Sequence, residues 1–387
     1  MKKSLVGLMT AAALLVAAAP AHAQNTVKVG VILSLSGQFA DAGVQLQNGI
    51  KTYMQQYGDT VAGKKIELIF KDTGGVAPDV AKRLAQELVV RDRVDILAGF
   101  VLTPNALAAS DVSAEAKKFM VIMNAATSVV ITKSPYSVRT SVTLPQVAQT
   151  FGTWAATKGG VKKSYTMVTD YGPGHDFERA FIKGFRDSGG EILGSVRFPI
   201  ANPDFSAFVQ RAKDLNPESI MIFIPGGAQP AALGKAFAER GIDLNKTKVL
   251  GSGETTAEQA LKSMGDSSLG IITAWHYDYM DRNPKNIAFV KLFNDMHKRN
   301  PDFFSIGGYD GMHAIYESLK KTGGRTDGDA LVAAAKGLKW DSPRGPMTID
   351  PETRDVVQTV YIRRVQKVGS ELVNVPFDRI ENVKDPK

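Results

Sequence analysis

The 387-residue sequence contains no cysteine, which excludes disulfide bonds and thiolate metal sites. The fold must therefore be stabilised by a packed hydrophobic core. Beyond the first 23 residues the histidines are His175, His276, His297 and His313, and they do not form the His-Glu-x-x-His spacing of a zinc site. The sequence thus predicts no metal site and no cofactor.

Motifs of the common enzyme classes are also missing. The chain has no G-x-x-x-x-G-K-[ST] phosphate-binding loop, no G-x-G-x-x-G after its first predicted strand and no G-x-S-x-G nucleophile elbow. Gly251-Ser252-Gly253 lacks the rest of a dinucleotide-binding pattern. These absences favour a binding protein over an enzyme. An exported hydrolase that uses His276 or Asp176 stays open as an alternative from another class.

Charge of one sign is not concentrated in any stretch. The 47 Lys and Arg residues exceed the 39 Asp and Glu residues, giving a formal charge of +8, but the basic residues are scattered. Lys162-Lys163 and Arg363-Arg364 are pairs rather than tracts. Nucleic-acid binding needs a concentrated basic face, so we expect no nucleic-acid partner.

The most extended apolar run lies near the N-terminus. Residues 5–19 follow the basic Met1-Lys2-Lys3 and precede the small-residue cleavage site Ala21-His22-Ala23. This pattern predicts a secretory signal peptide over residues 1–23, since the run is too short to span a bilayer comfortably. No later run is long and apolar enough to do so. We expect an exported protein, soluble after cleavage, without a lipid anchor there because no cysteine is present.

Short apolar runs alternate with amphipathic stretches along the rest of the chain. This alternation predicts parallel sheets covered by helices, in two successive α/β lobes. The expected strands cover residues 27–35, 65–71, 95–98, 119–123, 165–169, 191–198, 219–224, 249–251 and 270–275. The expected helices cover residues 43–56, 79–90, 106–118, 175–188, 205–215, 229–240, 288–299 and 308–322. Residues 345–349 and 356–365 predict an antiparallel hairpin near the C-terminus.

Residues 94–128 form the stretch around which we organise the site. Two apolar strands flank a helix, and each strand runs into a turn of small and polar residues. In open α/β sheets, ligands bind outside the carboxyl ends of such strands. Thr103 before Pro104 predicts a helix start with a hydroxyl at the N-cap, next to amides that favour an anion. The plainer interpretation is that Thr103 only caps its helix.

Other loops at predicted strand ends carry polar or aromatic side chains. Each has a plain interpretation as a tight turn or a local packing residue. Together, from two lobes facing one crevice, they fit a ligand site better. The residues singled out in these loops are Phe39, Phe100, Tyr171, Gln229, Glu254 and Tyr277.

In these residues the sequence resembles the type I periplasmic binding proteins of ABC transporters, in the Leu/Ile/Val-binding branch. The likeness covers essentially the whole chain after residue 23 and rests on the order and spacing of several short motifs. These motifs are Val29-Gly30-Val31 with Ser36-Gly37, Asp72-Thr73-Gly74, Asn124-Ala125-Ala126-Thr127-Ser128, Asp170-Tyr171 with Gly174 and Asp176, Asp204-Phe205-Ser206, and Tyr309-Asp310-Gly311.

The resemblance implies a fold of two Rossmann-like lobes joined by three hinge crossings near residues 144, 275 and 345. It places residues 24–144 and 276–345 in the first lobe, and residues 145–275 and 346–387 in the second. It also implies a periplasmic monomer that closes over a small-molecule ligand by hinge motion and docks on an ABC permease in the inner membrane.

For the ligand, the resemblance implies a carboxylate held by the Thr103 hydroxyl, the Ala125 amide, and the amide and hydroxyl of Thr127. Closure would add contacts from Tyr171, Gln229, Glu254 and Tyr277. Because neutral donors can hold a carboxylate, no full positive charge is needed beside it.

The chain departs from the amino-acid binders of this family at informative positions. Ala42 and Ala228 stand where those proteins have aromatic residues, and the amine-binding carboxylate aligns with either Glu254 or Gly253. The pocket is therefore expected to be larger, and Phe39, Phe100, Tyr171 and Tyr277 could wall an aromatic ring.

We expect an aromatic acid, benzoate- or cinnamate-like, as the ligand. A branched-chain or other amino acid is the alternative within the family. A ligand-sensing receptor domain is less favoured, because the chain ends at Lys387 without a transmembrane segment.

Overall fold

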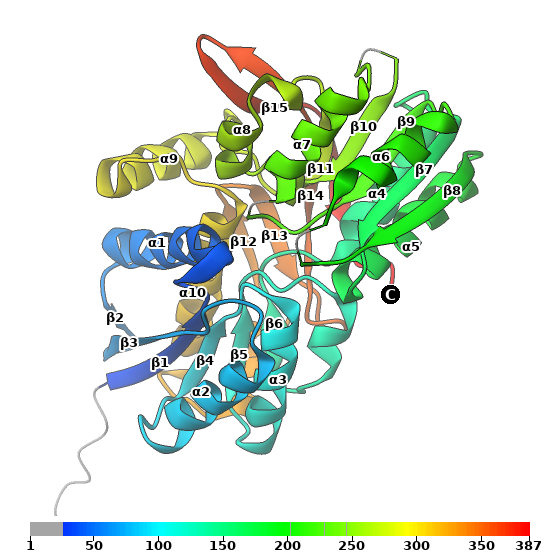
Figure 1. The fold of residues 1–387 in the computed structure, drawn as a ribbon. Helices are drawn as coiled ribbons and strands as arrows, with labels where there is room; N and C mark the ends of the chain where they lie inside the picture. Colours follow the sequence, from blue (N-terminus) through cyan, green and yellow to red (C-terminus); the bar gives the residue numbers. More distant parts are fainter. Residues whose placement is uncertain (1–25, 202, 228, 245) are drawn as a thin grey trace, which may run out of the picture.

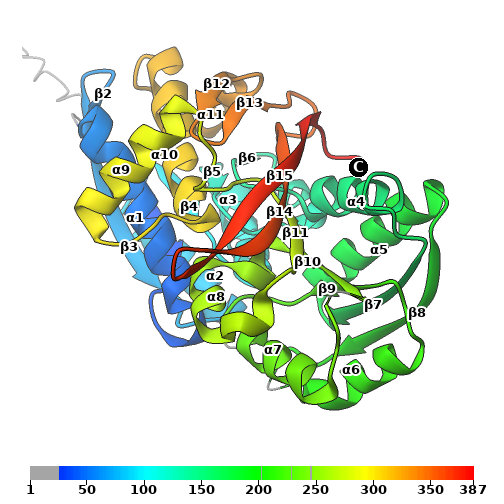
Figure 2. The ribbon, with the colours of Figure 1, turned by 90° about the horizontal axis from the view of Figure 1, so that it is seen from above.

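The computed structural model describes residues 26–387 except 202, 228 and 245, so the predicted signal peptide at residues 1–23 lies outside the described residues. The described chain forms two α/β lobes, each built on its own sheet (Figure 1). Figure 2 shows the same lobes from above, with the long β14–β15 ribbon running over the region between them. The predicted fold class is confirmed.

The sheet of the first lobe has the strand order β2-β3-β1-β4-β5-β6 in the described chain. All neighbours pair in parallel except β2, which is antiparallel to β3. The strands are β1 (Thr26–Leu33), β2 (Thr60–Val61), β3 (Lys64–Asp72), β4 (Ile96–Gly99), β5 (Phe119–Ile122) and β6 (Ser137–Arg139). The helices packed on this sheet or on one another are α1 (Ala40–Tyr57), α2 (Pro78–Val90), α3 (Thr103–Glu115), α9 (Pro284–His297), α10 (Phe303–Thr322) and α11 (Gly328–Ala335).

The second lobe repeats this arrangement. Its parallel strands have the order β8-β7-β9-β10-β11, and β14 adds to β11 in the antiparallel direction. The strands are β7 (Lys163–Thr169), β8 (Glu191–Phe198), β9 (Ser219–Phe223), β10 (Lys248–Ser252), β11 (Ile272–Trp275), β14 (Val356–Val368) and β15 (Glu371–Val383). The helices are α4 (Leu144–Ala156), α5 (Gly172–Asp187), α6 (Phe205–Asp214), α7 (Gln229–Arg240) and α8 (Glu258–Met264).

The order of the parallel strands explains where a ligand can bind. In each lobe the first strand lies between the second and the third, as β1 lies between β3 and β4, and β7 lies between β8 and β9. At this switch point neighbouring connections leave to opposite faces and open a crevice at the carboxyl ends of the strands. The carboxyl ends of β1 and β4 meet there, as their pairs Val29 with Ile96 and Ile32 with Gly99 show.

Side chains on the two faces of the first sheet enter different hydrophobic clusters. Val29 and Val31 of β1 face α1 and α10, whereas Ile32 faces α2 and α3. The same alternation holds along β5, where Val121 and Met120 join opposite clusters. A strand buried on both faces reads as a continuous apolar run, which is why the sequence pattern identified these strands.

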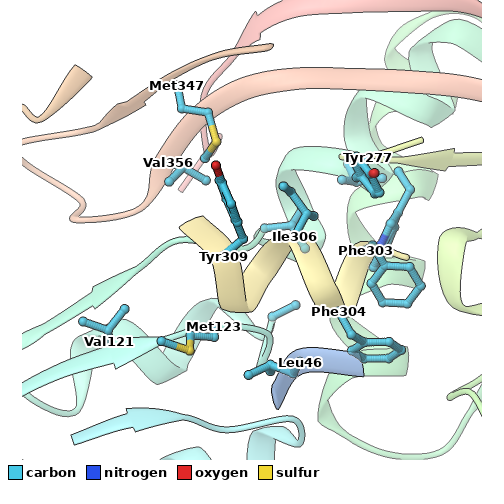
Figure 3. Packing of buried hydrophobic residues seen from close by; sticks show 14 of the residues in the cluster. Leu46, Val121, Met123, Tyr277, Phe303, Phe304, Ile306, Tyr309, Met347 and Val356 are labelled. Carbon is cyan, nitrogen blue, oxygen red and sulfur yellow. The ribbon is translucent and has the colours of Figure 1, made fainter. Parts of the chain in front are cut away.

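The prediction for α10 was wrong at its start. The helix was expected to begin at residue 308, but it begins at Phe303 and runs through Gly307 and Gly308. A Cβ on Gly308 would lie 2.2 Å from the carbonyl oxygen of Leu46, so glycine is required where α10 crosses α1 closely. Figure 3 shows Leu46, Met123 and Phe304 among the buried side chains around α10.

The C-terminal part confirms one prediction and extends it. The expected hairpin is present: Thr348 of β13 (Gly345–Ile349) pairs with Val357 of β14, in antiparallel register. β12 (Lys339–Ser342) pairs with β13, and β15 pairs with β14. The sequence prediction did not include β2, β6, β12, β15 or the helices α4, α8 and α11.

The chain passes between the lobes three times: from β6 to α4, from β11 to α9, and near β13, which pairs with β14 of the second lobe. The buried side chain of Arg344 links the first and the third of these crossings. Its guanidinium pairs with Asp310 at 2.7 Å and donates to the backbone carbonyls of Thr140 and Ser141, while its own carbonyl accepts from Tyr361. The boundaries proposed at residues 144, 275 and 345 stay a prediction.

Within the described residues, we find no helix with the length and apolar character that crossing a membrane would require.

Candidate ligand-binding site

A cavity of about 480 Å³ lies between the carboxyl ends of the two sheets. Loops of both lobes line it, and mostly apolar side chains form its wall. None of the described lining residues is a lysine or arginine. The residues used below are Phe39, Ala42, Thr103, Asn124, Tyr171, Phe223, Gly226, Glu254, Asp302 and Phe304.

The first-lobe wall carries a pair of hydroxyls. Thr103 lines the cavity, and its Oγ1 lies 2.9 Å from Oγ1 of Thr127, which follows β5. The prediction that Thr103 is an N-cap was wrong: α3 begins at Thr103, Leu102 is the N-cap residue, and no side-chain capping bond is found there among the described residues. Each hydroxyl can rotate to donate to an anion, so the pair is suited to a carboxylate.

Arg139 supports this wall from behind. Its guanidinium is fully buried and donates from Nη1 to the carbonyls of Ala125 and Thr127 at 2.9 and 3.0 Å. Its Nε pairs with Asp355 at 2.8 Å, so the charge is compensated away from the cavity. Bonding both carbonyls fixes the turn that carries Thr127, which preorganises its amide and hydroxyl.

Three residues predicted for this wall, Phe100, Ala125 and Thr127, are not among those that line the cavity, and Thr127 reaches it only through its hydrogen bond with Thr103. The Ala125 amide donates to the Phe100 carbonyl at 2.9 Å, so it is occupied within the protein. Phe100 has a φ of +69°, a turn that sends its buried ring into the cluster with α2 and α3. The positive φ is the physical reason why position in the loop did not reveal the direction of the ring.

Tyr171 and Glu254, two of the predicted ligand-binding residues, line the cavity on the second-lobe side. Burial raises the pKa of the Glu254 carboxyl to about 7. A hydrogen bond from the Gly226 amide has the opposite, smaller effect on this pKa. Burial, with a smaller contribution from the Glu254 charge, raises the pKa of the Tyr171 hydroxyl well above its usual range. The described residues form no salt bridge with Glu254, so a neutral or weakly charged carboxyl faces the cavity near neutral pH.

Gln229 and Tyr277 are placed beside the site rather than among the lining residues. Gln229 opens α7, and its Nε2 donates to the Ile200 carbonyl at 2.7 Å. Tyr277 is buried, with its hydroxyl donating to Asn286 at 2.9 Å and its ring against Phe289. Phe39 and Ala42 line the cavity, whereas Ala228 lies outside the described residues.

The sequence prediction did not include several polar lining residues, of which Asn124 and Asp302 are buried. The Asn124 Nδ2 donates to the Val101 carbonyl at 2.7 Å, which leaves its buried Oδ1 without a described partner. Asp302 caps α10, and burial raises the pKa of its carboxyl to about 7. Asn124 could have been found, because it directly follows a strand end in the stretch first singled out.

The two residues considered for a hydrolase do not lie on the cavity wall. His276 is completely buried, and burial lowers its pKa well below the usual value. The Asp176 carboxylate is occupied by Ser128 and Arg179. Neither side chain is placed to activate a nucleophile on a molecule in the cavity.

Two doubly wound lobes, three crossings and a cavity between the strand ends define a two-lobed ligand-binding protein. The chain belongs to the periplasmic binding protein family, whose sequence profile matches residues 26–370. It is similar to Leu/Ile/Val-binding protein homolog 6 of Brucella melitensis, with 41% identity over 384 residues, 98% of this chain and 97% of that protein.

Solved structures give the same assignment. A solute-binding protein of an ABC transporter from Rhodopseudomonas palustris BisB5, in complex with 3,4-dihydroxybenzoic acid, has 49% identity and a TM-score of 0.89, covering 94% of this chain and 99% of that chain. A counterpart from Rhodopseudomonas palustris HaA2, in complex with p-hydroxybenzoic acid, has 38% identity and a TM-score of 0.90, covering 93% and 98%. The chain is therefore an ABC solute-binding protein, a transport component and not an enzyme.

Proposed function

We propose that this protein captures an aromatic carboxylate in the periplasm by hinge closure and delivers it to an inner-membrane ABC permease. The signal peptide proposed at residues 1–23 would export it, and it would act as a monomer. The observation that supports the ligand class is the asymmetry of the cavity: the Thr103 hydroxyl, paired with that of Thr127, lies at one wall, and apolar side chains form much of the remainder.

The carboxylate is proposed to bind at the first-lobe wall. The Thr103 and Thr127 hydroxyls would donate to it, and so would the Thr127 amide, for which the described chain offers no acceptor. Hydrogen bonds from neutral groups to a charged acceptor are strong enough to hold it without a cationic side chain.

The ring is proposed to lie among Phe39, Phe223 and Phe304, which line the cavity. Ala42 leaves room there that an aromatic side chain would fill. The complexes of similar proteins with 3,4-dihydroxybenzoic acid and p-hydroxybenzoic acid support this class of ligand.

An amino acid is the second candidate, because relatives carry Leu/Ile/Val-binding names. It would need a negative charge for its ammonium group, and Glu254 is the available carboxylate on the opposite wall. The raised pKa of Glu254 makes that charge only partial near pH 7.

Isothermal titration calorimetry with benzoate, 4-hydroxybenzoate, 3,4-dihydroxybenzoate, cinnamate and L-leucine separates the two candidates. We expect tight binding of an aromatic acid and no comparable binding of leucine. Tight leucine binding without any bound aromatic acid would overturn the proposal. Thr103→Val, which keeps the shape but removes the donor, should weaken every carboxylate in the panel.

A further inference from the structure

A hydrogen-bonded contact joins the two lobes beside the cavity. Oδ2 of Asp176, on α5 of the second lobe, accepts from the Ser128 amide at 3.0 Å and from the Ser128 hydroxyl at 2.9 Å. Ser128 belongs to the first lobe, in the turn after β5. One carboxylate oxygen therefore receives two donors from a single residue of the other lobe.

The contact is buried. The Asp176 side chain is 8% exposed, and its second oxygen, Oδ1, pairs with Arg179 of the same helix. A carboxylate loses its hydration when it is buried, and that cost is offset only where donors replace the water. In an open form, water would solvate both Asp176 and Ser128, so the two cross-lobe bonds belong to the closed form.

Both partners lie on the segments that form the cavity. Ser128 directly follows Thr127, and Asp176 lies one turn of α5 after Tyr171 and Gly172. These segments are in contact, because a Cβ on Gly172 would lie 4.0 Å from Cγ2 of Thr127. A ligand that draws Tyr171 toward Thr127 would also bring Asp176 to Ser128.

We propose that Asp176 is a positioning residue for ligand capture, whose carboxylate latches the closed lobes at Ser128 without touching the ligand. The latch adds a protein–protein contact to the ligand's own contacts, so it slows ligand release rather than speeding capture. This inference rests on the proposed function only in that the bound small molecule is held by closure; it does not depend on the ligand being aromatic.

A purely structural role for Asp176 makes a different prediction. Near the N-terminus of α5, with Arg179 three residues away, Asp176 could stabilise only its own helix. In that case, loss of the Asp176 side chain would lower the stability of the second lobe. This effect would not depend on Ser128, and the distance between the lobes would not change.

The test uses Asp176→Ala, Ser128→Ala and the double variant. Asp187→Ala is the matched control, because Asp187 ends the same helix in an exposed pair with Lys183. Calorimetry and stopped flow use 4-hydroxybenzoate, or L-leucine if that acid does not bind. We expect Asp176→Ala to raise the dissociation constant about tenfold, through the dissociation rate, as expected for hydrogen bonds to a charged group.

The double variant should bind the ligand no more weakly than Asp176→Ala does, because both substitutions act on the same contact. If the affinity losses of the two single variants add in the double variant, the latch is overturned. A loss of affinity in Asp187→Ala as large as that in Asp176→Ala would overturn it too.

Interlobe distances supply the second measurement. The chain has no cysteine, so Val90→Cys and Leu215→Cys, at exposed positions of the first and second lobes, can carry spin labels for pulsed EPR. We expect Asp176→Ala to reduce the closed population in the liganded and the ligand-free protein, and Asp187→Ala to leave it unchanged.

Equal distance distributions in wild type and Asp176→Ala would refute the proposal, whichever ligand the calorimetry identifies. A protein that binds leucine but no aromatic acid would overturn the proposed ligand class, while the distance measurement would still decide on the latch.

Discussion

The two walls of the cavity are built differently. On the first-lobe wall, small polar side chains stand at strand ends, and the buried Arg139 holds the turn from behind. On the second-lobe wall, Tyr171 and Glu254 stand next to the Gly226-Gly227 turn, and Glu254 forms no ion pair with any described residue. For the proposed ligand this difference implies a division of labour: the rigid first wall would hold the carboxylate, and the second wall would contact the rest of the ligand on closure.

The largest effect is expected from Arg139→Met, which tests the rigidity of the first wall. The substitution leaves the Asp355 carboxylate buried without its partner and removes the bonds to the carbonyls of Ala125 and Thr127. We expect the free energy of unfolding to fall by about 3–5 kcal/mol, measured by urea denaturation.

Arg83→Met is the control for that experiment, because Arg83 forms an exposed pair with Glu87 on α2. Its free energy of unfolding should change by less than about 1 kcal/mol. Equal stability of the two variants would mean that the buried pair does not support the wall.

The next effect is expected from Thr127→Ala, which removes a donor of the first wall. Carboxylate affinity should fall by about 1–3 kcal/mol, the range for a hydrogen bond to a charged group. Thr132→Ala, in the same turn but exposed and bonded only to the Val129 carbonyl among described residues, should bind as wild type does. Unchanged affinity in Thr127→Ala would place the carboxylate elsewhere.

A smaller effect is expected from pH, through the second wall. Glu254 is mostly protonated below its pKa of about 7 and negative above it. Since a negative side chain disfavours an anion in the same cavity, affinity for a benzoate should fall as the pH rises from about 6 to about 8, by less than tenfold per unit.

Calorimetry across that pH range with Glu254→Gln as the comparison isolates this residue from Asp302, whose pKa is also about 7. The variant should show a flatter profile. An affinity that rises with pH would instead indicate a cationic group on the ligand, as in an amino acid.

The smallest effect on binding is expected from Tyr277→Phe. The hydroxyl of Tyr277 bonds Asn286 outside the cavity wall, so affinity should stay within about twofold of wild type, while stability falls by about 1 kcal/mol. Calorimetry and thermal unfolding measure the two quantities. A large loss of affinity with unchanged stability would instead show that the Tyr277 hydroxyl contacts the ligand.

Much of the fold could be predicted because local patterns carried it. Buried parallel strands such as β4 and β5 are continuous apolar runs, and the 3.6-residue stripe of α2 marks one face of a helix. The start of α10 could not be predicted in this way. Glycine disfavours a helix by local propensity, but the close approach of Gly307 to the Met123 carbonyl and of Gly308 to the Leu46 carbonyl requires it inside α10.

The site residues also divide into those that the sequence could predict and those that it could not. Thr103, Tyr171 and Glu254 follow strand ends, so the topology brought them to the cavity, and Thr127 joins them through Thr103. Phe100 and Tyr277 also follow strand ends, but a positive φ directs the ring of the first into a core cluster and Asn286 engages the second. No sequence pattern around Arg139, Asp176 or Ser128 predicted the contacts that these residues make.

By itself the sequence determined the two α/β lobes, the edge of each sheet at which the cavity lies, and the lack of cysteine and catalytic motifs. These follow from periodicity and composition, which act over a few neighbouring residues. The tertiary structure decided which side chains face the cavity, which carboxyls have a pKa raised by burial, and which residues join one lobe to the other. These depend on contacts between residues far apart in the chain, such as Arg139 with Asp355, which no local pattern encodes.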